Sequence, residues 1–123
     1  VETFPEDSRA TFQGYMRADG RAGTRNFISI VSTVNCSATV VHAIADHFNE
    51  ERLSQYHNVD GVAAFSHNTG CGMELTGEPM NLLHRTLAGY IKNPNVAASL
   101  VVGLGCERCQ VGGLFETQKL QPD

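Results

Sequence analysis

Residues 27–37 read Phe-Ile-Ser-Ile-Val-Ser-Thr-Val-Asn-Cys-Ser, a β-branched apolar run that ends in a loop containing a cysteine. The same pattern recurs in residues 62–71 and 100–106, which also end in cysteines. The three cysteines stand at equal intervals of 35 residues, about one strand–helix–strand unit, which takes roughly 30 residues or more. Parallel strands would place them on one edge of a sheet, where open α/β sheets bind ligands. These cysteines are Cys36, Cys71 and Cys106.

Two helices are predicted between the apolar runs. Ser37 is a plausible N-cap for the first helix, which ends near Asn49. Its apolar face is formed by Val40, Val41, Ala43, Ile44, Ala45 and Phe48. Glu78-Pro79 opens the second helix, since proline is tolerated in the first turn, and Asn93-Pro94 stops it. Its buried side is predicted to hold Met80, Leu83, Leu87, Ala88 and Ile91.

The order strand–helix–strand–helix–strand predicts an α/β, Rossmann-like layered fold with a parallel sheet of at least three strands. Residues 1–12 are polar and aperiodic and are interpreted as a linker or domain-boundary tail, and residues 13–123 as the α/β domain. The weak amphipathic pattern in residues 110–123 stops early. Three strands make a thin domain, so we expect either that the chain is a fragment of a larger enzyme or that a partner covers its open edges.

Composition excludes several classes of function. A net charge of −4 without a basic run argues against nucleic acid as a partner. No apolar stretch approaches the roughly 18 residues of a membrane helix, and residues 1–7 lack the pattern of a signal peptide. Four cysteines without a secretory signal favour a reducing compartment. The sequence therefore predicts a cytoplasmic domain with free thiols.

Residues 14–26 form a glycine- and arginine-rich segment, with three residues of each kind. Asp19-Gly20 within it is a strong turn signal. Clustered guanidinium groups on such a loop suit a carboxylate or phosphate ligand. The alternative is a solvated turn whose arginines pair with local acids. The arginines are Arg17, Arg21 and Arg25.

Thiol and imidazole groups form the sharpest candidate site. His67 and Cys71 stand four residues apart in a glycine-rich turn, and Glu107 directly follows Cys106. Thiolate with imidazole suits zinc or iron, and three converging thiolates with an open position suit an iron–sulfur cluster. The alternative is three buried thiols that only pack near strand ends. A general acid or base next to a glycine loop would be His67 or one of the carboxylates Asp19, Glu74 and Glu107.

Two further functions stay open at this stage. Cys106 and Cys109 form a single C-x-x-C, the spacing of thioredoxin-like redox sites. A reversible disulfide there would indicate a redox domain. A non-catalytic metal- or anion-binding module would use the same loops without chemistry.

Several segments together resemble the sugar-acid dehydratase family that contains galactarate dehydratase and altronate dehydratase, as its second-domain segment. They follow in order over residues 12–110, which makes the match specific, and the middle and last segments look closer to the galactarate branch. The segments are Gly14-Tyr15, Arg17-Ala18-Asp19-Gly20-Arg21, Gly23-Thr24-Arg25-Asn26, Asn35-Cys36, Asn58-Val59-Asp60-Gly61-Val62, His67-x-x-Gly70-Cys71-Gly72 and Gly103-Leu104-Gly105-Cys106-Glu107.

The resemblance implies an iron(II)-dependent hydro-lyase that removes water from a sugar acid to give a 2-keto-3-deoxy acid. It implies a small-molecule substrate, the remaining domains of the same enzyme as partners, and a homo-oligomer. Some family members are sulfolactate sulfo-lyases. The motifs give positions and not mechanism, so the roles of individual residues are our hypothesis. It assigns metal binding to Cys36, Cys71 and Cys106, catalysis to His67 and Glu107, and substrate binding to Arg17, Asp19, Arg21, Thr24, Arg25 and Asn26. An iron–sulfur cluster is the alternative to a single iron ion. The isolated segment is expected to be inactive if catalytic groups lie elsewhere.

Overall fold

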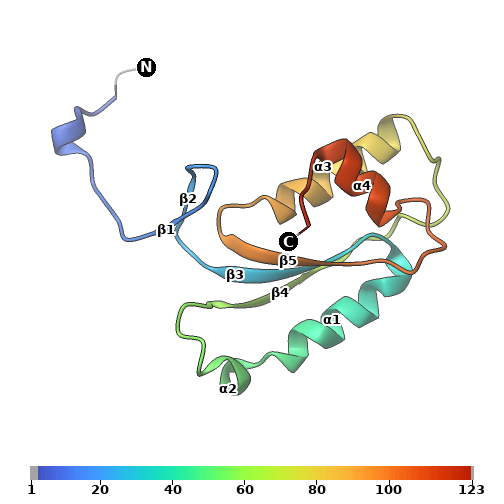
Figure 1. Ribbon diagram of the computed structural model, residues 1–123, viewed down its shortest axis with the longest axis horizontal. Helices are drawn as coiled ribbons and strands as arrows, with labels where there is room; N and C mark the ends of the chain where they lie inside the picture. The colour runs from blue at the N-terminus through green and yellow to red at the C-terminus, as the bar shows by residue number, and fades with distance from the viewer. Residues whose placement is uncertain (1–2, 123) are drawn as a thin grey trace.

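The computed structural model describes residues 3–122, and its centre is a parallel sheet of three strands (Figure 1). The strands are β3 (Phe27–Ser32), β4 (Gly61–Phe65) and β5 (Val96–Val102), in the order β4-β3-β5. Ile30 of β3 is paired with Ala64 of β4 and with Leu100 of β5. The predicted α/β fold with a three-stranded parallel sheet is confirmed.

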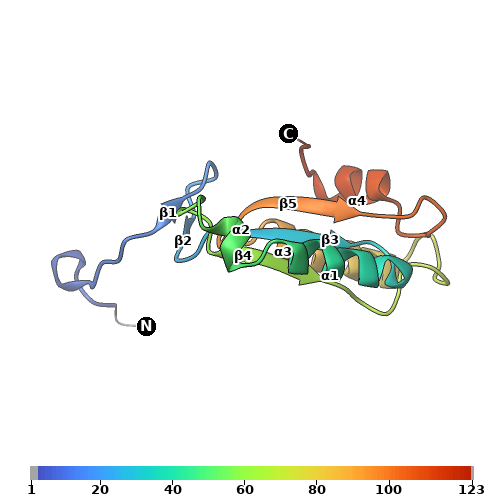
Figure 2. The same ribbon diagram turned by 90° about the horizontal axis from the view of Figure 1, so that it is seen from below.

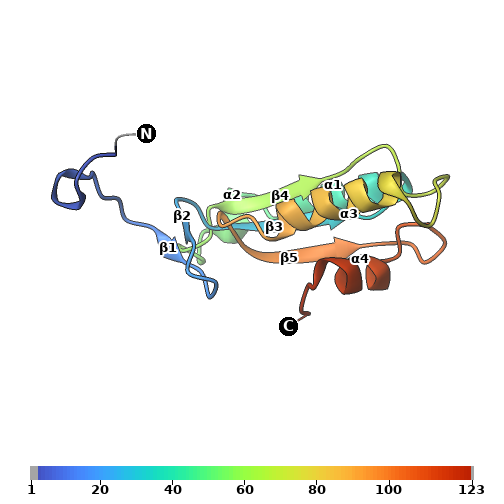
Figure 3. The same cartoon turned by 90° about the horizontal axis from the view of Figure 1, so that it is seen from above.

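Helices cover the two faces of the sheet in three layers (Figures 1 and 3). Helix α1 (Ala38–His47) packs on β3 and β4, and it is followed by the short α2 (Glu50–Leu53). On the other face α3 (Glu78–Ile91) packs on β3 and β5, and α4 (Val111–Gln118) packs on α3. Within residues 3–122, none of the helices has the length and apolar character needed to cross a membrane.

Most of the central strand is buried, because strands pair with both of its edges and a helix packs on each of its faces. Ile30 and Val31 are almost fully buried on opposite faces of β3. Its two buried serines satisfy their hydroxyl groups within the fold, as buried polar groups must. Ser29 Oγ lies 2.6 Å from Ser99 Oγ, and Ser32 Oγ lies 2.8 Å from Ser37 Oγ. Polar residues are thus compatible with a central strand.

The main core lies between the sheet, α3 and α4. The predicted buried side of α3 is confirmed, because four of its five residues are buried and Ile91 is partly buried. These four are Met80, Leu83, Leu87 and Ala88. Leu114 and Leu120 from the end of the chain complete this core.

The predicted apolar face of α1 is only partly right. Val41 is fully buried, but Val40 and Phe48 remain 46% and 43% exposed. Six apolar residues cover too wide an arc for one sheet to bury, because a helix on a sheet presents a single stripe to it. Ser37 is the N-cap residue as predicted, yet its hydroxyl bonds Val34 O instead of capping the helix.

A small hairpin precedes the sheet. Strands β1 (Tyr15–Met16) and β2 (Ala22–Gly23) pair antiparallel, and the turn between them contains Gly20 at φ 82°. Residues 3–14 extend away from the sheet and contain the short turn η1 (Glu6–Ser8) (Figure 1). A second short turn, η2 (Asn35–Ser37), leads into α1.

Candidate functional site

Three loops meet where the parallel strands end, and we name this side of the sheet the carboxyl edge. The loops are residues 33–37 after β3, 66–72 after β4 and 103–109 after β5. Each carries one of the three equally spaced cysteines, and all three thiols are free and exposed. In the order β4-β3-β5, the chain adds β4 on one side of β3 and β5 on the other, so the strand order reverses between β3 and β5. Open α/β sheets bind ligands at this switch point.

Backbone hydrogen bonds tie the three loops together. Asn35 N donates to Thr69 O at 2.9 Å. Gly70 O accepts from both Arg108 N at 2.8 Å and Cys109 N at 3.1 Å. Gly70 has φ 95°, and a Cβ at this residue would lie 2.2 Å from Thr33 O. The position therefore requires glycine on two grounds, conformation and space.

Glu107 is the buried carboxylate of the carboxyl edge, with 3% of its surface exposed. Its Oε1 accepts from Thr33 Oγ1, and both carboxylate oxygens accept from Leu104 N, all at 3.1 Å. Burial alone would raise the pKa of Glu107, but backbone amides of the loop and the Thr33 hydroxyl lower it below the ordinary value. The Glu107 carboxylate therefore points into its own loop, where the Leu104 backbone amide and the Thr33 hydroxyl donate hydrogen bonds to it. Thr33 was not singled out in the sequence, since it looks like ordinary strand sequence.

At the carboxyl edge, both ring nitrogens of His67 form hydrogen bonds. Thr69 N donates to Nδ1 at 3.2 Å, so Nε2 carries the proton and donates to Ser32 O at 3.0 Å. Burial lowers the pKa of His67, which opposes protonation of the ring. The neutral imidazole therefore connects the loop after β4 to the end of β3.

The predicted metal ligands share the carboxyl edge without converging. Within residues 3–122, no three side chains from His, Cys, Asp and Glu are placed to hold one metal ion. Cys36 Sγ has a contact of 3.5 Å with the neighbouring Asn35 Oδ1. The soft thiols have the chemistry that suits iron, but the described residues do not form its complete site.

The arginine-rich hairpin lies at the opposite, amino edge of the sheet (Figure 1). It precedes β3, and Thr24 N donates to Asn95 Oδ1 just before β5. A single site combining the predicted metal ligands with the predicted substrate-binding arginines would need the arginine loop on the carboxyl edge, and the domain places it on the other edge. The reason is topological, because the hairpin joins the start of β3 whereas the cysteines follow strand ends.

Several of the six predicted substrate-binding residues already form hydrogen bonds or ion pairs with other residues of the domain. Arg17 donates from Nε to Pro94 O at 2.8 Å and from its terminal nitrogen to Asn26 Oδ1 at 2.8 Å. Arg21 pairs with Asp19 at 2.7 Å. These contacts are those of the alternative interpretation, a turn whose arginines bond locally.

Asp60 organises the remaining part of the amino edge. It accepts from Asn26 N at 2.5 Å and lies 3.5 Å from a guanidinium nitrogen of Arg25, which stays largely exposed. Asn26 is buried, and its side chain also donates to Asn58 O. Asp60 belongs to one of the segments that carry the family resemblance, so the sequence pointed to this residue. Its contacts with Asn26 and Arg25 were not predictable from the sequence. Substrate binding by the hairpin stays a prediction.

Cys109 belongs to the core and not to the exposed thiols. It is fully buried against the residues of the α3–α4 core. Burial, with the nearby Glu107 carboxylate, raises the pKa of its thiol to about 11. A thiol of this kind is a poor nucleophile, which counts against the C-x-x-C redox alternative.

Comparisons with known proteins identify the family. A family model described as D-galactarate dehydratase/Altronate hydrolase, second domain, matches residues 14–123. Altronate dehydratase of Escherichia coli K12 is 38% identical over 105 residues, and galactarate dehydratase (L-threo-forming) of the same organism is 37% identical over 110 residues. The alignments cover 85% and 89% of this chain. The two identities do not separate a galactarate from an altronate branch.

The (2R)-sulfolactate sulfo-lyase subunit beta of Chromohalobacter salexigens is 34% identical over 94 residues, or 76% of this chain. In each of these three relatives the aligned part is 21% of the relative, so the chain spans about a fifth of their length. No solved structure matches the chain significantly. With a family model covering nearly the whole chain and this fold, the chain belongs to the D-galactarate dehydratase/altronate hydrolase family, as its second domain.

Proposed function

We propose that this chain is one domain of a hydro-lyase that removes water from a sugar acid of the galactarate or altronate type. The proposal is supported by relatives named altronate dehydratase and galactarate dehydratase. The structural observation that carries it is the carboxyl edge, where three exposed thiols lie on loops joined by hydrogen bonds. Activity belongs to the longer enzyme, because the chain spans 21% of these relatives.

The reaction removes a proton from the carbon next to the carboxylate and hydroxide from the following carbon. The resulting enol rearranges to the 2-keto-3-deoxy acid, so the balance is the loss of one water. A base must accept the carbon-bound proton. We assign this task to the carboxyl edge, where His67 is more accessible than Glu107. His67 Nδ1 can accept a proton once the loop releases Thr69 N.

Glu107 fits a supporting role in this proposal better than direct proton transfer. Its carboxylate is buried and already accepts hydrogen bonds from Thr33 and Leu104. It fixes the loop that carries Cys106, and through that loop it positions the thiol. Direct catalysis by Glu107 remains a prediction that requires movement of this loop.

Iron(II) or an iron–sulfur cluster remains the predicted cofactor of the whole enzyme. The described residues supply exposed thiols but bring no three donors together, so further donors have to come from the rest of the protein. The substrate-binding role of the hairpin residues is likewise proposed for the whole enzyme. Arg25 is its most exposed arginine and the best candidate for a substrate carboxylate.

The test uses the full-length protein that contains this chain, assayed with galactarate and altronate for 2-keto-3-deoxy acid. Single Cys36→Ser, Cys71→Ser and Cys106→Ser variants are compared with Ser54→Ala, a change at the end of α2, remote from the carboxyl edge. We expect a loss of at least about 100-fold in kcat/KM for the cysteine variants, with an unchanged melting temperature. Full activity in all three would overturn the role of the thiols.

Anaerobic iron reconstitution of the same proteins, followed by metal analysis, tests the cofactor separately. Stoichiometric iron in the parent protein and its loss in Cys71→Ser would support a site that includes this domain. Iron retained in every cysteine variant would contradict it.

A second candidate reaction is cleavage of sulfolactate. It is supported by the 34% identity to a protein named (2R)-sulfolactate sulfo-lyase subunit beta. Release of sulfite from (2R)-sulfolactate by the full-length protein, without activity on sugar acids, would favour it over dehydration.

A further inference from the structure

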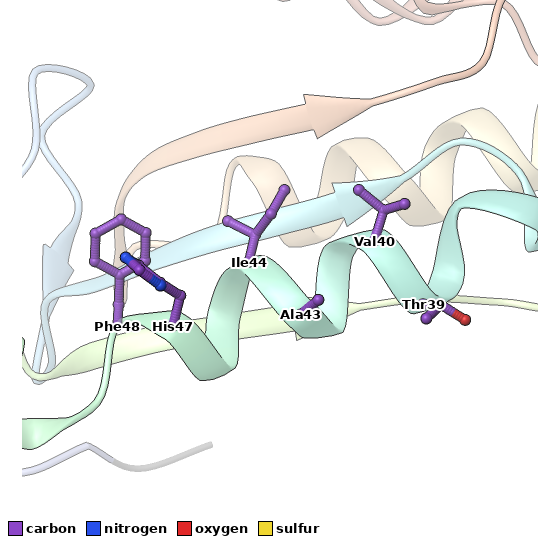
Figure 4. Close-up of a pocket in the computed structure, with 6 residues that line it drawn as sticks. All are labelled: Thr39, Val40, Ala43, Ile44, His47 and Phe48. Atoms are coloured by element: carbon purple, nitrogen blue, oxygen red, sulfur yellow. The ribbon is translucent and has the colours of Figure 1, made fainter.

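One side of α1 and the adjoining part of β5 form an apolar surface that no residue of the described chain covers. Val40 is 46% exposed, Phe48 is 43% exposed, and Leu100 of β5 is 49% exposed. Figure 4 shows Val40, Ile44 and Phe48 projecting from the same side of α1. We name this the α1–β5 surface. Within it, Thr39, Val40, Ala43, Ile44, His47 and Phe48 line a shallow hollow of about 450 Å³.

A groove continues this surface from the helix to the sheet. Its volume is about 330 Å³, and its lining contains no charged side chain. Ile28 and Ile30 of β3 lie between Leu100 on β5 and Ile44 on α1. Tyr56, which follows α2, lines its far end and is half exposed. An apolar groove on the face of a parallel sheet is unusual, because such sheets are normally covered on both sides.

The asymmetry of the helix layers explains why the groove is open. On one face α3 covers β3 and β5, with α4 packed beside it. On the other face α1 covers β3 and β4 and leaves β5 without a helix (Figure 2). The uncovered face of β5 lies beside α1, where a second helix of the same layer would pack, since packed helices lie about 8–10 Å apart.

We propose that the α1–β5 surface is the docking surface for the remaining region of the same enzyme, which packs an apolar helix over β5 beside α1. The relatives are about five times as long as the aligned part, because this part is 21% of each. A large region of the same polypeptide is therefore held close to this domain at high effective concentration. The uncharged lining requires an apolar partner surface, because an unpaired charge would be costly to bury there.

The first experiment places a photoreactive benzoylphenylalanine at Val40 in the full-length protein, with Leu82 on the opposite helix layer as the matched control. Leu82 is 56% exposed but lies on α3. We expect the probe at residue 40 to cross-link within one polypeptide, to a peptide outside residues 14–123. The probe at residue 82 should not give this product. Cross-links between two chains, or none from residue 40, would overturn the proposal, the former by identifying a second copy as the occupant.

A second measurement needs no probe. Val40→Glu in the full-length protein should lower the melting temperature by about 2–4 °C or more, whereas Leu82→Glu should shift it by no more than about 1 °C. Equal shifts would overturn the proposal. If Val40→Glu does not fold, the cross-linking result decides. Neither readout uses substrate, so a failure here is distinct from a failure of the proposed reaction.

Discussion

Glu107 is a predicted catalytic residue whose carboxylate also stabilises the folded loop after β5. Its carboxylate is buried, yet the loop surrounds it with donors instead of a cation. Gly103 leaves the space for it, since a Cβ there would lie 2.3 Å from Glu107 Oε1. The Gly-x-Gly-Cys-Glu segment is therefore a structural unit in which glycine and glutamate depend on each other.

The first prediction concerns this carboxylate. Glu107→Gln should lower the free energy of unfolding by about 1–3 kcal/mol at pH 7, because hydrogen bonds to a charged acceptor are lost. The pKa of Glu107 is lowered in the fold, so its stabilisation is complete above the ordinary carboxyl value of 4.5 and is lost as the pH falls below it. Urea unfolding at pH 7 and pH 4 should show a smaller acid effect in the variant. Glu116→Gln, at an exposed carboxylate, is the control; equal losses in both variants would contradict the prediction.

The second prediction distinguishes the four thiols. Cys36, Cys71 and Cys106 are exposed and should react with a thiol reagent such as DTNB in the folded chain. Cys109 is buried with a pKa of about 11, so it should react only after unfolding. Three fast thiols and one slow thiol are expected, and Cys109→Ala should remove only the slow one. Four fast thiols would show that the core around residue 109 is open.

At the scale of elements, the loops of the carboxyl edge depend on exact backbone geometry. Gly70 approaches the end of β3 so closely that its carbonyl reaches the loop after β5. Gly72, two residues later, has open space around it. The two glycines look alike in the sequence, but only one of them joins the elements.

The third prediction uses this difference. Gly70→Ala should destabilise the chain by about 2–4 kcal/mol, because strain from a positive φ costs roughly 1–3 kcal/mol and the Cβ collides with Thr33 O. Gly72→Ala, the matched control, should change stability by less than about 0.5 kcal/mol. The midpoints of urea unfolding measure both. Similar midpoints for the two variants would contradict the described packing of this loop.

At the scale of the whole molecule, α3 and α4 are joined by a buried histidine. His84 Nδ1 donates to Thr117 Oγ1 at 2.8 Å, and that hydroxyl donates to Gly113 O. The unprotonated Nε2 is buried and has no partner among residues 3–122. A proton on Nε2 would therefore place a charge between the helices without an acceptor.

The fourth prediction follows from this arrangement. Burial lowers the pKa of His84 below 6.5, so the unfolded chain binds its proton first. This contribution to stability is complete above pH 6.5 and is lost as the pH falls through 6.5 towards the lower folded value. An NMR titration of the His84 ring should give a midpoint below 6.5, and His84→Phe should weaken the loss of stability between pH 7.5 and 5.5. A midpoint at or above 6.5 would contradict the prediction.

The sequence by itself determined the three strands of the sheet, the helices α1 and α3 and the buried side of α3, whereas α2 and α4 were not predicted. These features depend on local patterns, namely β-branched runs, helical periodicity and the prolines near both ends of α3. The equal spacing of the cysteines was also sufficient to place each of them after a strand. The recognisable segments identified the family, because their order extends over most of the domain.

Only the tertiary structure decided which of these segments meet. The choice of β3 as the central strand depends on pairing between residues more than 30 positions apart. The same choice joins Thr33 to Glu107 and leaves Val40 and Leu100 exposed. A local pattern specifies what a residue can contact, but the order of strands and the layers above them determine what it does contact.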